Sequence, residues 1–256
     1  MKRLKTGITV LLAVVAGIAL LAVTSPEVHA QDTGADPQAA QILKRMTDYL
    51  GSLQKFSVHT HNTIEDVIDA GPRVDVDISA SVIVSRPDKL HAERKGGLLD
   101  QVFFYDGRTL TLFNPSDGVY ASEPAPATIE EMLDHARESL DLVLPAADLV
   151  YRNAFPLLMK DVYLAMVVGQ AVIEGVVCDH LLFSRPGVDF QVWVAAEGEP
   201  LPYKYVVTDR ALPGRLSIVT VMRDWNVAPS VSAAQFSFDP PQGAQTIRFL
   251  PRATGN

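Results

Sequence analysis

Two pairs of side chains in this sequence are spaced for metal binding. His59 and His61 are two residues apart, and so are His91 and Glu93 further along the chain. Residues two apart on a β-strand point to the same face, and zinc accepts imidazole and carboxylate ligands. Such a site requires the two strands to be neighbours, whereas the Ser and Thr residues around them favour a solvated outer surface. A metal-dependent enzyme using His59 and His61 is therefore only a second alternative, and we expect no metal site.

The single cysteine and an adjacent acid–histidine pair are the other candidates for catalysis. Cys178 is followed by Asp179 and His180, but the chain has no G-x-S-x-G nucleophile motif. The neighbours of Cys178 are apolar, which is typical of a small buried side chain. Phosphate loops, dinucleotide fingerprints, CxxC pairs and calcium loops are also missing from the sequence. We therefore expect a protein that is not an enzyme, with no catalytic residues and no cofactor.

The elements that would position these residues are mainly β-strands. Apolar and polar residues alternate with a period of two through most of the chain. The clearest run is 73–85, which at 3.3 Å per residue is about 40 Å long. A hairpin is predicted for 189–208, and a last short strand for 236–238. We count ten to twelve strands joined by short turns, and strands this long favour a large curved sheet over a small sandwich.

Three helical segments interrupt the strands. An amphipathic helix is predicted for 38–53 and a second for 128–143, where Thr128 and Glu131 form a capping box. One or two short helices follow within 146–160. The predicted fold class is α+β: a large curved antiparallel sheet forming a half-open β-barrel, with the N-terminal helix and the inserted helical segment covering its concave face.

The N-terminus has the form of a secretory signal peptide. Basic Lys2, Arg3 and Lys5 precede an apolar run at 8–23, and cleavage is predicted after Ala30. The mature chain, 31–256, is expected to be a single periplasmic domain with no stable membrane insertion. Removing the leader changes the net charge from −8 to −10, which does not suit binding to nucleic acid. With one Cys, the fold must do without an internal disulfide.

Several segments resemble a family of predicted periplasmic proteins of unknown function, DUF2092, within the LolA/LolB-like lipoprotein-carrier superfamily. The similar segments are RPDKLHAER, FFYDGRTLTLFNP, APATIEEMLDHA, GVVCDHLLFSRPGVDFQVWV and LPYKYVVT. The resemblance covers about 38–251. It implies an open β-barrel with helices across its mouth and a periplasmic location. It implies no catalytic or binding residues.

The apolar strand face and the apolar stripe of the 128–143 helix would enclose a cavity, and such spaces bind small ligands. We therefore expect a non-enzymatic binding or carrier protein for a lipid or a lipoprotein acyl chain. The alternative is an envelope sensor or interaction module that binds a protein partner. The residues expected to line the cavity are Val74, Val76, Ile78, Val82, Val84, Leu110, Leu112, Met132, Leu133, Ala136, Leu140, Val192 and Val194.

Overall fold

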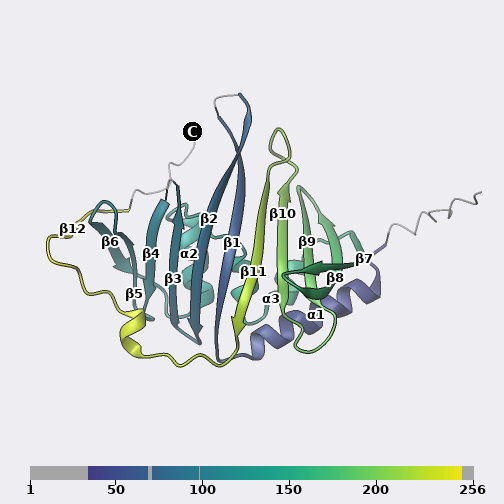
Figure 1. The fold of residues 1–256 in the computed structure, drawn as a ribbon, viewed down its shortest axis with the longest axis horizontal. Coiled ribbons are helices and arrows are strands. Elements are labelled where there is room, and N and C mark those ends of the chain that lie inside the picture. The colour runs from purple at the N-terminus through teal and green to yellow at the C-terminus, as the bar shows by residue number, and fades with distance from the viewer. Residues whose placement is uncertain (1–33, 69–70, 98, 250–256) are drawn as a thin grey trace, which may run out of the picture. The chain divides into compact units, whose positions relative to one another are not determined.

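The computed structural model describes residues 34–68, 71–97 and 99–249. The predicted signal peptide, 1–30, lies outside these residues. In the described part of the chain, twelve strands form one sheet (Figure 1). The strands are β1 Lys55–Val67, β2 Arg73–Ser85, β3 Lys89–Gly96, β4 Leu99–Tyr105, β5 Thr109–Asn114, β6 Val119–Pro124, β7 Leu164–Ile173, β8 Val176–Arg185, β9 Val188–Ala195, β10 Pro202–Asp209, β11 Ser217–Asn226 and β12 Gln245–Thr246.

The sheet is open, because its strand order, β12-β6-β5-β4-β3-β2-β1-β11-β10-β9-β8-β7, has two ends. All neighbouring strands are antiparallel except β12 and β6. The central pair, β1 and β2, is in register from Lys55 opposite Ser85 to Val67 opposite Arg73. The predicted α+β class with a large open antiparallel sheet is confirmed.

Three α-helices cover the concave face of the sheet: α1 (Pro37–Ser52), α2 (Ile129–Glu138) and α3 (Ala154–Met159). The described residues also form two short 3₁₀ turns, η1 (Ala147–Val150) and η2 (Ala233–Phe236). In Figure 1, α2 and α3 lie behind the strands, so the view shows the convex face. The carboxylate of Asp36 caps α1 by accepting a hydrogen bond from the backbone N–H of Gln38 at 2.8 Å.

The helices divide the concave core into two parts. Ile42, Leu43, Met46 and Leu50 of α1 pack against one half of the sheet, with Phe183, Phe190 and Tyr205 among their neighbours. Ile129, Met132, Leu133 and Ala136 of α2 pack against the other half, with Phe103, Tyr105 and Leu110. Each cluster is formed by one apolar helix stripe on alternate residues of several strands.

The second helix is shorter than the sequence indicates. The apolar stripe predicts a helix to Val143, but α2 ends at Glu138. Asp141 adopts a left-handed backbone conformation, with φ of 54°, which directs the chain out of the helix. Residues 139–146 then cross the concave face as an irregular segment.

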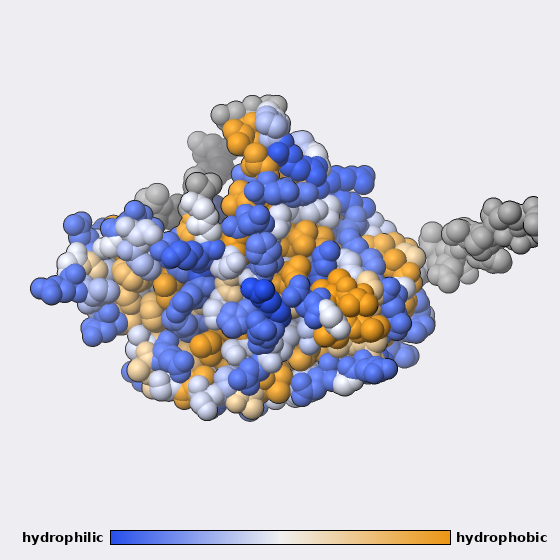
Figure 2. Space-filling view, viewed as in Figure 1, coloured by the Kyte–Doolittle hydropathy of each residue, from blue (hydrophilic) through white to orange (hydrophobic). Residues whose placement is uncertain are grey.

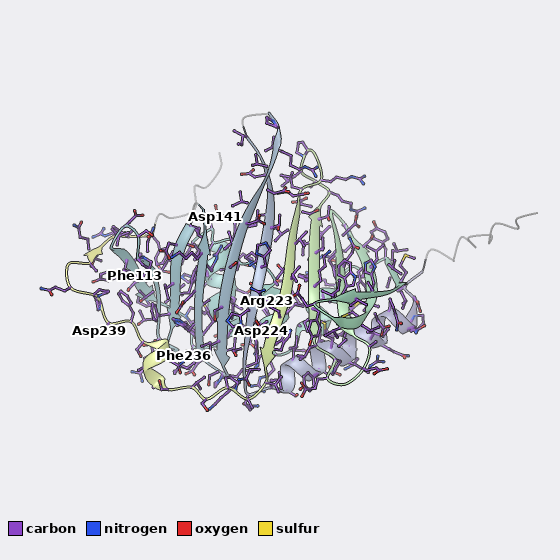
Figure 3. All side chains as sticks on the ribbon, in the orientation of Figure 1. Phe113, Asp141, Arg223, Asp224, Phe236 and Asp239 are labelled. Atoms are coloured by element: carbon purple, nitrogen blue, oxygen red, sulfur yellow. The ribbon has the colours of Figure 1, made fainter. Side chains whose placement is uncertain are left out.

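The C-terminal part of the chain also differs from the prediction. Residues 236–238 form no strand, and Phe236 is the last residue of η2. Phe238 packs on the convex face against three aromatic rings. Its ring centroid lies 5.3 Å from that of Phe104, 5.3 Å from that of Phe113 and 5.0 Å from that of Tyr120. Figure 3 labels Phe113 and Phe236 in this region. The short β12, which the sequence pattern did not reveal, then pairs with β6.

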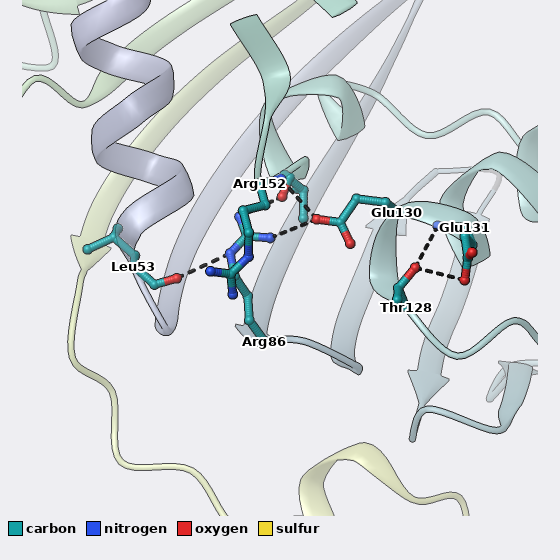
Figure 4. A network of polar contacts seen from close by, with 7 residues as sticks. Leu53, Arg86, Thr128, Glu130, Glu131 and Arg152 are labelled. Atoms are coloured by element: carbon teal, nitrogen blue, oxygen red, sulfur yellow. Dashed lines mark hydrogen bonds and ion pairs between the residues drawn. The ribbon is translucent and has the colours of Figure 1, made fainter.

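A buried arginine joins the helices to the sheet. The Arg86 side chain is 1% exposed. Its Nε donates to the Leu53 carbonyl at 3.1 Å, and one terminal nitrogen donates to the Val150 carbonyl at 2.6 Å. The other lies 3.4 Å from the Glu130 carboxylate, which also accepts from the Arg152 backbone N–H at 2.9 Å (Figure 4). Arg86 thus connects the end of α1, the start of α2 and the end of η1.

Replacing Arg86 by Met should destabilise the fold by about 3 kcal/mol. The change leaves the partly buried carbonyls of Leu53 and Val150 without this donor and removes one donor from Glu130, and such losses cost about 1–3 kcal/mol each. The measurement is the free energy of unfolding in urea. The control is Arg73→Met, which removes an exposed pair with Glu65 at 3.0 Å and an exposed hydrogen bond to the Gly214 carbonyl at 2.6 Å, and should cost at most about 1 kcal/mol. Equal effects in the two variants would contradict the role given to Arg86.

Candidate ligand-binding cavity

An apolar cavity of about 110 Å³ lies between the sheet and α2. Its walls come from the concave faces of β1–β5 and β11, from α2 and from residues 144–150. All lining residues except Thr60, Asn62 and Arg94 are apolar. The lining residues are Phe56, Val58, Thr60, Asn62, Ala80, Val82, Leu90, Ala92, Arg94, Phe103, Leu110, Met132, Leu133, Ala136, Leu144, Pro145, Ala146, Ala147, Leu149, Val150, Met222 and Trp225.

The space exists because small side chains face each other across it. Ala80 on β2 and Ala92 on β3 stand on the sheet, and Ala136 stands on α2. Strand register places Ala80 directly between Thr60 of β1 and Arg94 of β3. One step along the strands, Val82 lies between Val58 and Ala92. The alanines leave room that larger residues would fill in a close-packed core.

The buried amide in the cavity wall is satisfied within the protein. The Asn62 amide nitrogen donates to the Thr60 hydroxyl at 2.9 Å and to the Ile78 carbonyl at 3.3 Å. Its oxygen accepts from the Thr220 hydroxyl at 2.8 Å. Buried polar groups that pair with each other contribute to the fold and leave the cavity surface largely apolar.

Arg94 is the one charged residue among the described residues that line the cavity. One terminal nitrogen donates to the Val143 carbonyl at 3.0 Å, and the guanidinium lies over the Phe103 ring, 5.4 Å from its centroid. Burial lowers the pKa of Arg94. An arginine remains protonated in proteins, so the cavity has a positive charge in its wall.

A larger groove of about 500 Å³ adjoins the cavity. It is lined by residues 141–146, α3 and the strands β10 and β11, together with Arg137, Asp148 and Arg185. Leu144, Pro145 and Ala146 border both spaces. The irregular segment after α2 is therefore the partition between an inner apolar cavity and an outer, more polar groove.

Five of the residues expected to line the cavity border it: Val82, Leu110, Met132, Leu133 and Ala136. The other eight do not. Val84, Leu112 and Leu140 pack in the core beneath α2. Val192 and Val194 are buried in the core beneath α1, because β9 lies in the other half of the sheet. Val74, Val76 and Ile78 lie further along β2, beyond the cavity.

Sequence reasoning missed Arg94 and the 144–150 wall. The strand 89–96 appeared merely highly charged, yet Leu90, Ala92 and Arg94 alternate with His91, Glu93 and Lys95. That alternation could have identified Arg94 as the charged residue on an otherwise apolar face. The 144–150 segment has no periodic pattern, so its place depends on tertiary packing.

The histidine pairs do not assemble into a metal site. His59 and His61 point to the convex face, 3.5 Å from Asp224 and 3.3 Å from Asp77 respectively. His91 lies 3.2 Å from its neighbour Glu93. Because β2 lies between β1 and β3, the two pairs stand about 10 Å apart. Within residues 34–68, 71–97 and 99–249, no three His, Cys, Asp or Glu side chains are grouped to hold a metal ion.

His180 has a packing role on the convex face. Its ring stacks on Trp193 with centroids 4.0 Å apart, and its Nε2 lies 2.8 Å from the Gln191 side-chain oxygen. Lys204 covers the other side of this aromatic pair, 4.7 Å from the Trp193 centroid. The adjacent Asp179 accepts a hydrogen bond from Gln170 at 2.9 Å, so it does not orient His180.

The chain belongs to the DUF2092 family of predicted periplasmic proteins, whose family model matches residues 39–250. The expected family and location are thereby confirmed. None of the helices in the described part of the chain has the length and apolar character that a membrane span requires.

No curated protein matches the sequence, but several solved structures are similar. An uncharacterized conserved protein from Thermus thermophilus is 12% identical over 82% of this chain and 99% of its own, with a TM-score of 0.49. The lipoprotein LppX from Mycobacterium tuberculosis is 14% identical, with 77% and 100% covered and a TM-score of 0.44. A LolA superfamily protein from Nitrosomonas europaea is 14% identical, with 78% and 97% covered and a TM-score of 0.39. Similarity at this level carries no functional conclusion.

The thiol of Cys178 should be unreactive in the folded protein. Cys178 is fully buried, and burial, with the nearby Asp179, raises its pKa to about 11. Two pKa units lower the thiolate fraction about 100-fold, and the thiolate is the reacting form. The measurement is the rate of labelling by Ellman's reagent. A Cys178→Ala/Ser79→Cys variant provides an exposed thiol on the convex face as reference. Similar rates for the two proteins would show an accessible Cys178 and reopen its role as a nucleophile.

Proposed function

We propose that the protein is a non-enzymatic periplasmic binding or carrier protein that holds the apolar part of a hydrophobic or amphiphilic ligand in the cavity beneath α2. The apolar lining is the observation that carries the proposal. Water gains few hydrogen bonds in such a space, and apolar cavities stay dry and take up apolar molecules. The family's periplasmic description agrees with a role in handling envelope lipids or acylated proteins.

The size of the cavity defines what it holds. A cavity of about 150 Å³ in another protein binds benzene, so about 110 Å³ accommodates a short apolar segment. A longer acyl chain would continue into the outer groove, from which only Leu144, Pro145 and Ala146 separate the cavity.

Filling the cavity should weaken the binding of an apolar probe. Ala80→Leu adds a larger side chain to the cavity wall, and overpacking a filled site costs about 1–3 kcal/mol, or about tenfold in affinity or more. The measurement is a fluorescence titration with N-phenyl-1-naphthylamine. Ser79→Leu is the matched control, because it makes the same addition one residue away on the convex face. Equal affinities for the two variants would contradict binding in this cavity.

Native mass spectrometry of mature protein purified from its own envelope tests the function directly. A lipid or acylated peptide that copurifies would support the proposal and define the chemical class of the ligand. Protein that carries no adduct and takes up no probe would overturn it.

A protein partner is the second candidate function. Val172 of β7 and Val177 of β8 face each other across the hairpin and are 66% and 48% exposed. Figure 2 shows an apolar patch in the region of the β7 and β8 hairpin. If the protein is an envelope sensor, the wild type should capture a protein partner and take up no lipid. A Val172→Asp/Val177→Asp variant should no longer capture that partner. The sensor function would be excluded if the wild type took up lipid and the variant captured the same proteins as the wild type.

A further inference from the structure

The charge in the cavity wall stands at one end of the apolar lining. Arg94, Ala92 and Leu90 alternate along β3 on the concave face and all border the cavity. Four residues of strand span about 13 Å. The Val143 carbonyl that Arg94 contacts belongs to a residue that is 53% exposed. Arg94 is therefore at the mouth, and the apolar walls of Ala92, Phe103 and Leu90 lead inward from it.

The Arg94 guanidinium retains unused donor capacity. A guanidinium has five N–H donors, and among the described residues Arg94 makes one hydrogen bond, to a neutral carbonyl. No carboxylate in the described part of the chain lies within 4.0 Å of it, whereas Arg137 pairs with Asp148 at 2.9 Å nearby. Arg94 is only partly buried, so a ligand can reach it, and without a protein carboxylate beside it an anion is favoured at this place.

Arg86, which is buried, shows the contrast. Arg86 stands near the opposite end of the lining, with its guanidinium 5.9 Å from the ring centroid of Phe56. Its donors are taken by two carbonyls and by Glu130. Arg86 makes three hydrogen bonds inside the protein, one of them to a carboxylate. Arg94, at the mouth of the cavity, makes one hydrogen bond, to the Val143 carbonyl.

We propose that the ligand of this cavity is a single-chain amphiphile with an anionic head group, which the Arg94 guanidinium binds at the mouth while the chain lies against Ala92, Phe103 and Leu90. The inference rests on the proposed function and names the ligand class. Carboxylate and phosphate head groups share the required geometry, since both accept two parallel N–H donors from arginine.

Binding of four ten-carbon amphiphiles below their micellar concentrations tests the charge. The ligands are decanoate, decyl phosphate, decanol and decyltrimethylammonium, each measured by displacement of N-phenyl-1-naphthylamine. A hydrogen-bonded charge contributes enough to favour an anion over decanol by about 10- to 100-fold. The cation should bind most weakly. Whichever anion binds more tightly identifies the head group.

Two variants assign the preference to Arg94. Arg94→Met should bring the ratio of decanoate to decanol affinity close to one, and Arg94→Lys should retain part of the preference because it keeps the charge. Arg223→Met removes an exposed arginine from the convex face, where Figure 3 labels Arg223, and should leave the ratio as in the wild type. The ratio is read within each protein, so a general loss of stability does not alter it.

The possible results separate the two proposals. Equal binding of anions and decanol by the wild type, or a preference that survives in Arg94→Met, overturns the anionic head group and leaves a cavity for neutral ligands. Failure of all four amphiphiles and of the probe to bind overturns the proposed function itself.

Discussion

The hydrogen bonds of Arg86 hold the helical cover on the sheet. Its guanidinium reaches the last turn before β1, the first turn of α2 and the end of η1, which are far apart in sequence. An open sheet needs such a connection, because its concave face is apolar and no closing strand protects it. A buried charge is costly unless it is paired, and the partners of Arg86 lie at the end of α1, the start of α2 and the end of η1.

Once the cover is fixed in this way, the space beneath it follows from side-chain size. α1 fills one half of the concave face with large residues such as Leu43 and Met46, and these pack to 0% exposure. α2 covers the other half, where Ala80, Ala92 and Ala136 leave a gap that no neighbour fills. A core built only for stability would close such a gap, since empty volume costs free energy. The cavity therefore exists because alanine, a small residue, occupies these three positions.

Local sequence patterns predict the individual strands and helix starts of this architecture. The alternation at 73–85 predicts β2 to the residue, and Thr128 marks the start of α2 correctly. Long-range features were not predictable: α2 ends early because Asp141 turns left-handed, and the pairing of β12 with β6 has no periodic signal. The same division applies to the cavity. The stripe of α2 places Met132, Leu133 and Ala136 at the cavity, but of the five residues expected on β2 only Val82 borders it. Val192 and Val194 lie elsewhere because strand order puts β9 in the other half of the sheet.

Strand register explains how one face serves both stability and recognition. Across β1, β2 and β3, the row Phe56, Val84 and Leu90 is apolar and near the Arg86 end. Two residues along each strand, Val58, Val82 and Ala92 form a second apolar row. The next row, Thr60, Ala80 and Arg94, is the first to contain polar atoms. Thr60 is hydrogen-bonded to Asn62, so the polarity available to a ligand in this row is that of Arg94. Polarity thus increases toward the mouth, in the direction that an amphiphile with its chain inward and its head outward requires.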